Sequence, residues 1–247
     1  MTDVEEVKHL LKSLNPAQQR EVLTYLREIV PQHEIEKQLM ASAETLLNAL
    51  ARSPELTRRM IRGVIAEAAF ATDVIPTLRD WTEKSVERDQ PYDFMLTDDA
   101  QSAVKPGHAP ESDVRVQVKM QRSRRGMPLL ASEVWTRRVR WPAGHYVVEV
   151  QRTRTGQRSG VRTRPYRFGE FDILAVSMGP ATGRWADFMY TLERWLLPKP
   201  DKSEEVLTFQ PVAPESNEYW TSDFVQCVRW LRSGETKRLG WDMSRSR

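Results

Sequence analysis

The 247-residue sequence predicts an α+β fold, in which a mixed central sheet is flanked by helices and preceded by an all-helical N-terminal module. Two observations carry this prediction. Apolar residues recur at helical spacing through the first 75 residues, and strand-like segments begin after Pro76. Residues 170–178, "EFDILAVSM", form a near-continuous apolar run, which is typical of a central strand that is covered on both faces.

Capping signals divide the helical part. Asn15 and Ser53 are each followed by proline, so we expect them to be N-caps with proline at the first helical position. The four predicted helices span residues 4–14, 15–30, 33–51 and 53–75. Near its end the last helix is apolar almost all round, which predicts burial, and there it carries Glu67. We therefore expect a helical module over 1–53 and a core domain over 54–247.

The rest of the core alternates between strands and polar connections. Strands are predicted at residues 92–96, 114–120, 144–156 and 170–178, an amphipathic segment at 184–198 and a final helix at 216–234. In the strand "VRVQVKM" the valines point to one face, which places Gln117 and Lys119 together on the other. That second face is either exposed to solvent or the floor of a site.

Basic residues are concentrated in one part of the chain. The net charge is only +3, yet the stretch from Lys119 to Arg167 holds thirteen basic residues and two acidic ones, Glu133 and Glu149. A block of one sign favours a phosphate-rich ligand, and arginine binds phosphates and guanine edges in a forked geometry. The predicted DNA-binding residues are Arg122, Arg124, Arg125, Arg137, Arg138, Arg140, Arg152, Arg154, Arg158, Arg162, Arg164 and Arg167.

The sequence lacks the residues that several other kinds of site require. Cys227 is the only cysteine, which excludes a disulfide framework and a cysteine-based zinc site. The sequence has no phosphate-binding glycine loop with its lysine, no histidine pair at metal-ligand spacing and no Gly-x-Ser-x-Gly turn. It also has no apolar run near the roughly 18 residues of a membrane span and no signal-peptide pattern. We therefore expect a soluble cytoplasmic protein.

Four polar residues occur in a suggestive order: Glu67 in a helix, Asp93 in "PYD", then Gln117 and Lys119 on one strand. This order over residues 54–178 resembles the PD-(D/E)xK nuclease superfamily, whose pattern is a helical Glu, an Asp near a strand start and an acid-x-Lys pair. The present sequence departs from it by one residue inserted between Pro91 and Asp93 and by Gln in place of the acid. The resemblance is strongest to type II restriction endonucleases and intron-encoded homing endonucleases, and it implies a restriction-endonuclease-like core.

The resemblance implies catalysis with Mg²⁺, for which Mn²⁺ can substitute. Oxygen ligands suit Mg²⁺, which takes one or two carboxylates and keeps several waters. The expected ligands are Asp93, the backbone carbonyl of Val118, the amide oxygen of Gln117 and, with added weight because Gln117 is neutral, Glu67. Lys119 is the expected catalytic cation, which would orient the water, stabilise the phosphate charge or act as a base.

Structural alternatives exist for each of these residues. Glu67 could pair with Arg62, and Asp93 could serve only in a turn. Asp113 is the replacement if Asp93 is not the ligand, and Glu149 with Gln151 alternates in the same way as Gln117 with Lys119. Asp172 is either an additional site member or a structural acid.

These features favour a type II restriction enzyme, which hydrolyses double-stranded DNA at a short sequence and leaves 5′-phosphate and 3′-hydroxyl ends. A palindromic site implies a homodimer, and the N-terminal helices would supply dimerisation or DNA contacts. A cognate DNA methyltransferase would belong to the same system without binding the enzyme. The alternatives are a homing or structure-specific nuclease of the same superfamily, a non-catalytic DNA-binding protein on that fold, and an RNA-binding protein.

Overall fold

The computed structural model divides into two compact units, Met1–Arg58 and Arg59–Arg247, so that the division falls within helix α5 (Glu55–Ala69). The residues it describes are 4–29, 33–87, 90–100, 113–133, 143–158 and 161–239, with the side chains of residue 28 and residues 153–164 left out. None of the described helices is long and apolar enough to cross a membrane.

The first unit consists of helices, as the sequence predicts. They are α1 (Val4–Ser13), α2 (Pro16–Ile29), α3 (Glu34–Gln38) and α4 (Ala43–Arg52). Asn15 caps α2, because its side-chain oxygen accepts hydrogen bonds from the backbone N–H groups of Ala17 and Gln18 at 2.9 and 3.0 Å. None of the described side chains of this unit is buried.

Two helix boundaries differ from the prediction. The single helix expected over 33–51 is wrong, since Met40 takes a positive φ of 49° and Ser42 then caps α4 by accepting from the N–H of Thr45 at 3.2 Å. Ser53, expected to cap the next helix, instead ends α4, and its hydroxyl donates to the carbonyl of Ala49 at 2.9 Å.

Helix α5 is buried only toward its C-terminal end. Leu56, Met60 and Val64 are exposed along one side, whereas Ala66 and Ala69 near the end are buried. The helix continues into a π-helical turn (Phe70–Val74) and a 3₁₀ turn (Ile75–Thr77). The sequence predicts burial near the end of this helix, and there Ala66, Ala69 and Phe70 are buried whereas Ile65 and Ala68 are exposed, so that the prediction is confirmed in part.

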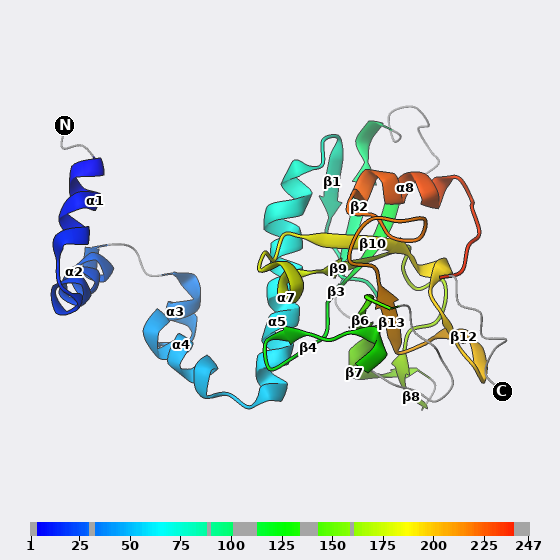
Figure 1. Cartoon of the computed structure of the whole chain (residues 1–247), viewed down its shortest axis with the longest axis horizontal. Helices are drawn as coiled ribbons and strands as arrows, with labels where there is room; N and C mark the ends of the chain where they lie inside the picture. The colour runs from blue at the N-terminus through cyan, green and yellow to red at the C-terminus, as the bar shows by residue number, and fades with distance from the viewer. Residues whose placement is uncertain are drawn as a thin grey trace. The chain divides into compact units, whose positions relative to one another are not determined.

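A five-stranded mixed sheet forms the centre of the second unit (Figure 1). Its strands, in spatial order, are β1 (Trp81–Lys84), β2 (Phe94–Asp98), β3 (Asp113–Met120), β9 (Ile173–Ser177) and β10 (Phe188–Leu192). β3 and β9 run parallel, and the other neighbours are antiparallel. All five residues of β9 are buried, which confirms the predicted central strand.

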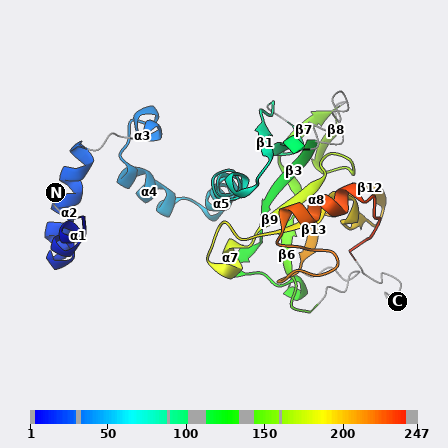
Figure 2. The same cartoon turned by 90° about the horizontal axis from the view of Figure 1, so that it is seen from above.

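Both faces of this sheet are covered. On one face, Val116 and Val118 of β3 pack with Ala66 and Phe70 from α5 and its extension and with Phe224 of α8 (Phe224–Arg232). Figure 2 shows α5, β3 and α8 from above. On the other face, Leu174 and Val176 of β9 pack against a second layer that includes β6 (Tyr146–Glu149) and β13 (Phe209–Val212), which pair with each other. The structure thus confirms an α+β fold with a mixed central sheet flanked by helices.

Three further strand pairs lie among the described residues of the second unit. They are β4 (Ser123–Arg124) with β5 (Met127–Pro128), β7 (Gln151–Arg158) with β8 (Val161–Pro165), and β11 (Pro198–Lys199) with β12 (Lys202–Val206). Two of these pairs, β4 with β5 and β7 with β8, lie in Arg-rich parts of the chain. The first turns at Arg125 and Gly126, both with positive φ (51° and 82°), as a two-residue hairpin requires.

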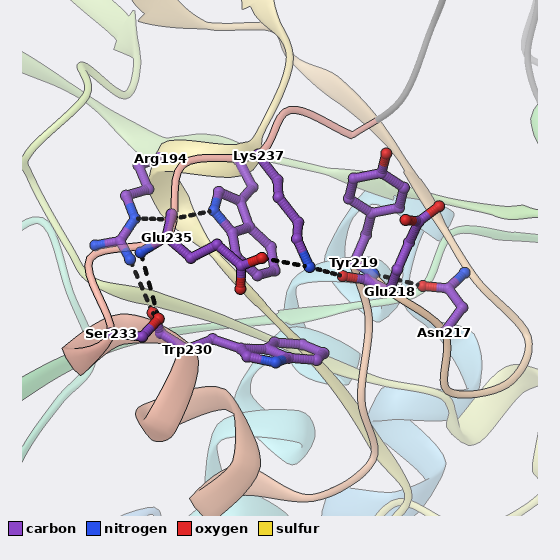
Figure 3. Close-up of polar contacts among 9 residues, drawn as sticks. Arg194, Asn217, Glu218, Tyr219, Trp230, Ser233, Glu235 and Lys237 are labelled. Atoms are coloured by element: carbon purple, nitrogen blue, oxygen red, sulfur yellow. Dashed lines mark hydrogen bonds and ion pairs between the residues drawn. The ribbon is translucent and has the colours of Figure 1, made fainter.

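The C-terminal segments also differ from the prediction. The amphipathic segment expected at 184–198 contains the fully buried strand β10, and the final helix begins only after Asp223, whose side chain caps it at Gln226. After α8 the chain is held by Arg194, which donates to the carbonyls of Trp230 and Glu235 at 2.9 and 3.1 Å (Figure 3).

Lys237 closes this C-terminal region. Its ammonium group lies 5.2 Å from the ring centre of Trp195 and 5.9 Å from that of Trp230, and it pairs with Glu235 at 3.0 Å (Figure 3). The segment that follows α8 is thereby held against α8 itself and against the 3₁₀ turn Glu193–Trp195 that follows β10.

Candidate active site

The polar residues singled out in the sequence come together at one end of the sheet. Glu67 lies on α5, Asp93 directly precedes β2, and Gln117 and Lys119 lie on β3 on the face opposite its buried valines. Gln117 is only 1% exposed. Gln117 is buried and Lys119 half-buried, so this part of β3 is the floor of a half-buried polar site.

Asp93 and Gln117 form the centre of this site. The Asp93 carboxylate accepts from the backbone N–H of Val118 at 2.8 Å and from the side-chain amide of Gln117, both through Oδ2. The same amide nitrogen of Gln117 donates to the backbone carbonyl of Val118 at 3.1 Å. The carboxylate is thus fixed against the strand that carries Lys119.

The orientation of the Gln117 amide follows from its partners. Its nitrogen faces two acceptors, the carboxylate of Asp93 and the carbonyl of Val118, and its oxygen accepts from the hydroxyl of Tyr166 at 2.9 Å. Turning the amide over would place three acceptor oxygens together. The oxygen that was expected to bind a metal is therefore directed at Tyr166 in this state.

Tyr166 is a site residue that the sequence reasoning missed. It is 3% exposed, and its ring lies 5.6 Å from the ammonium of Lys119 and 5.7 Å from the guanidinium carbon of Arg152. Burial is the main cause that raises the pKa of Tyr166, so its hydroxyl keeps the proton that it donates to Gln117. No local pattern marks this tyrosine, which lies 49 positions after Gln117.

The two carboxylates influence each other. Burial and, to a smaller extent, the charge of Asp93 raise the pKa of Glu67 to about 7, although Lys119 opposes this shift. Burial likewise raises the pKa of Asp93, against the effects of Lys119 and of the Val118 N–H. A pair of half-buried acids with raised pKa values beside a lysine is typical of a functional site.

Lys119 is the positive charge of the site. Burial lowers the pKa of Lys119, but the oxygen atoms of Tyr166, Asp93 and Glu67 raise it by more, so that it lies above its ordinary value. In the metal-free site Lys119 is therefore a cation.

The oxygen atoms of the site suit a hard divalent ion. Glu67 and Asp93 offer two carboxylates, and the Val118 carbonyl lies within the same hydrogen-bonded group. Burial and mutual repulsion make these carboxylates unfavourable as free anions, which a bound cation would relieve. Within the described residues there is no cluster of three or more His, Cys, Asp or Glu side chains that could hold a metal. The donor set fits an ion that keeps water ligands.

Two further acids lie away from this centre. Asp172 accepts from the backbone N–H, Nε and Nη2 of Arg115 at 2.8, 3.0 and 2.8 Å, which is the arrangement of a structural acid. Asp113 lies at the other end of β3, where it accepts from Thr97 and pairs with Lys84.

Glu149 and Gln151 form a separate group. Gln151 donates to Glu149, and Glu149 also pairs with Arg122 at 2.8 Å and approaches Arg59 at 4.0 Å. Glu149 is thus surrounded by arginines, whereas Asp93 is coupled to Glu67 and Lys119. Asp93 therefore fits the role of a metal-binding acid better than Glu149 does.

The predicted DNA-binding arginines fall into four groups. Arg122 and Arg152 form ion pairs with Glu149 and Glu170, at 2.8 and 3.1 Å, whereas Arg124, Arg125 and Arg167 are exposed. Arg154, Arg158, Arg162 and Arg164 lie on β7 and β8, with side chains outside the described set. Arg137, Arg138 and Arg140 lie outside the described residues.

Gln121 is a second residue that the sequence reasoning passed over. It follows Lys119 by two positions, is 0% exposed, and neither its amide nitrogen nor its oxygen has a hydrogen-bond partner among the described residues. Its signal in the sequence was the continuing alternation Gln117, Lys119, Gln121.

Comparisons with known proteins give one structural likeness. No known protein family and no curated protein matches the sequence. Among solved structures, a bacterial homing endonuclease, I-Ssp6803I, is similar over 72% of this chain and 98% of its own, with 18% sequence identity and a TM-score of 0.36.

Proposed function

We propose that this chain is a metal-dependent endodeoxyribonuclease whose site follows the PD-(D/E)xK arrangement, with Gln117 in the place of the second acid. The observation that carries the proposal is the coupling of Glu67, Asp93 and Lys119 in one half-buried site. Phosphodiester hydrolysis needs both an electrophile at the phosphate and a positioned water, and these residue types meet both needs.

Each residue has a distinct role in this proposal. Asp93, Glu67 and the Val118 carbonyl would hold Mg²⁺ or Mn²⁺, which when bound polarises the phosphoryl oxygen and lowers the pKa of the attacking water. Lys119 contributes a positive charge beside the scissile phosphate. Gln117 fixes Asp93, and the buried layer around Tyr166 limits access of bulk water.

The substrate proposed is double-stranded DNA, cut as by a type II restriction enzyme to leave 5′-phosphate and 3′-hydroxyl ends. The supporting feature is the basic block, of which Arg124, Arg125 and Arg167 are exposed. A homodimer is proposed with it, because two equivalent sites related by a two-fold axis match a palindromic duplex. The N-terminal helices, whose described side chains are all unburied, are candidates for the dimer contact.

The test is incubation of supercoiled plasmid DNA with the full chain and Mg²⁺, with excess EDTA as the control. Discrete fragments would support sequence-specific cleavage, whereas nicked or smeared DNA would indicate a structure-specific or nonspecific nuclease. Unchanged DNA that is nevertheless shifted on a gel would show a non-catalytic DNA-binding protein. Full cleavage in excess EDTA would exclude the metal mechanism.

A matched pair of variants ties the activity to the site. Asp93→Asn keeps the shape of the side chain but removes the charge that a cation needs, so cleavage should be lost. Asp187→Asn removes an acid that pairs with the exposed Arg184 at 3.0 Å, and cleavage should be unchanged. Equal activity in the two variants would contradict the assignment of Asp93.

A further inference from the structure

The amide nitrogen of Gln117 occupies a position of chemical interest. It donates to both the carboxylate of Asp93 and the carbonyl of Val118, which are two of the oxygen groups that a bound cation would join. Its two N–H groups thus bring partial positive charge to the place where negative oxygen atoms converge. In this state the amide satisfies the acceptors that would otherwise be free to bind a metal.

A glutamine side chain can donate hydrogen bonds to the Asp93 carboxylate and the Val118 carbonyl, but a glutamate side chain cannot. A carboxylate at position 117 would add a third acid beside Glu67 and Asp93, whose pKa values are already raised by burial. It would also leave the Val118 carbonyl without its side-chain donor. The neutral amide therefore stabilises the metal-free site at the cost of one potential anionic ligand.

Tyr166 holds the amide in this orientation. Its hydroxyl donates to the Gln117 oxygen at 2.9 Å, and its own position is fixed by the edge of Phe171, 5.3 Å between ring centres, and by a backbone hydrogen bond from Val206 at 2.8 Å. All three contacts come from buried groups. Release of the amide therefore requires loss of the Tyr166 bond or movement of a packed ring.

We propose that Gln117 and Tyr166 form a latch that holds the metal site closed until a divalent cation displaces the amide from Asp93 or from the Val118 carbonyl. This inference rests on the proposed function. Gln117 then opposes metal binding in the resting protein, and Tyr166 is a positioning residue that acts through Gln117. The latch lowers metal affinity, and in the metal-free protein it keeps the Asp93 carboxylate and the Val118 carbonyl hydrogen-bonded.

The test measures Mn²⁺ binding to the full chain, by titration calorimetry and by the paramagnetic signal of free Mn²⁺, without DNA and without turnover. Gln117→Met keeps the length of the side chain but removes its donors. Because a hydrogen bond to a charged group no longer has to be broken, Mn²⁺ should bind about tenfold more tightly than to wild type. If Gln117 is instead a ligand through its oxygen, the same substitution weakens binding.

Tyr166→Phe tests the latch without touching Gln117. The ring and its packing remain, but the amide oxygen loses its donor, so Mn²⁺ affinity should rise by a few-fold. Tyr190→Phe is the matched control, because Tyr190 is equally buried but packs in the other core cluster, and it should leave affinity unchanged. A merely structural role for Tyr166 would lower thermal stability without raising metal affinity.

The outcomes separate this inference from the proposed function. Tighter binding in Gln117→Met and Tyr166→Phe supports the latch. Binding to wild type that weakens or stays equal in both variants overturns the latch and leaves the nuclease proposal standing. No Mn²⁺ binding by wild type or by either variant overturns both.

Discussion

The carboxylate of Asp172 binds the backbone N–H and the guanidinium of Arg115 in the same forked contact, with distances of 2.8 to 3.0 Å. Asp172 lies just before β9, and Arg115 lies on β3, two residues before Gln117. The pair therefore fixes the parallel register that sets Gln117 opposite Leu174 and Lys119 opposite Val176. Asp172, a candidate site residue in the sequence, therefore supports the site indirectly, by holding β9 in register beside β3.

We expect Asp172→Ala to destabilise the protein. Arg115 and Asp172 are 34% and 21% exposed, so solvent partly screens their ion pair. The substitution should therefore lower the free energy of unfolding by about 2 kcal/mol. Urea denaturation of the full chain measures it. Asp187→Ala breaks the ion pair with Arg184, whose side chain is 77% exposed, and should cost less than about 0.5 kcal/mol. Equal losses would contradict a special role for the Arg115 pair.

A second prediction separates catalysis from binding. Lys119→Ala removes a charge beside the proposed scissile phosphate and should reduce the cleavage rate by about 10² to 10³. DNA affinity should change little, because the arginines of the basic block remain. Rates and gel-shift affinities are compared with those of Glu149→Ala, which should keep most activity. Normal cleavage by Lys119→Ala together with an inactive Glu149→Ala would show that the active site lies around Glu149 on β6 and not around Lys119 on β3.

A third prediction concerns Glu193, which is 4% exposed and accepts from the N–H of Gly169 at 2.6 Å. Burial raises the pKa of Glu193 from 4.5 to about 7, although the N–H groups of Gly169 and Glu170 oppose the shift. The folded state therefore holds a proton that the unfolded chain releases, and stability falls as the pH rises from about 4.5 to 7. The loss should be at most about 3 kcal/mol from this group.

The variant Glu193→Gln tests whether Glu193 makes the protein less stable as the pH rises. The variant should lose most of this pH dependence and be more stable than wild type at pH 8, as measured by urea denaturation across the pH range. Glu215→Gln, at an exposed position, provides the comparison and should follow wild type. A wild-type protein that becomes more stable between pH 5 and 7 relative to Glu193→Gln would reverse the assignment.

A fourth prediction concerns the basic block. DNA affinity without metal should fall by about 10³ to 10⁵ between roughly 50 and 200 mM salt if six to ten phosphates are contacted. Arg125→Ala, at the tip of the β4–β5 hairpin, should reduce the slope of log affinity against log salt by about 1. Arg184→Ala removes an exposed arginine outside the block and should leave the slope unchanged. A flat salt profile for wild type would show that the block does not contact DNA.

The parts of the fold that the sequence predicts well are those with a short-range physical signature. The strand around Gln117 alternates strictly, so its two faces follow from the geometry of a strand alone. Asn15 is likewise a local signal, because a cap satisfies N–H groups only two and three residues away. β9 is apolar at every position, and central burial follows directly.

The remaining parts depend on tertiary contacts that no local pattern records. Tyr166 reaches Gln117 only because β9 and the second layer place the two segments together. The strand β10 was interpreted as an amphipathic segment, since Trp185 and Glu193 beside it gave the stretch a mixed character. The break after Gln38 carried a local signal, namely Ser42, a favoured N-cap residue that directly precedes α4.

The parallel pairing of β3 with β9 has a consequence for the order of folding. The register partners Val116 and Ile173 are far apart in the chain, and a parallel pair cannot form through a tight turn, so the intervening segment must close before the strands pair. Contacts of such long range slow folding. During synthesis Lys119 leaves the ribosome well before Tyr166 and β9 do. The complete polar site therefore assembles late, when most of the chain has been made.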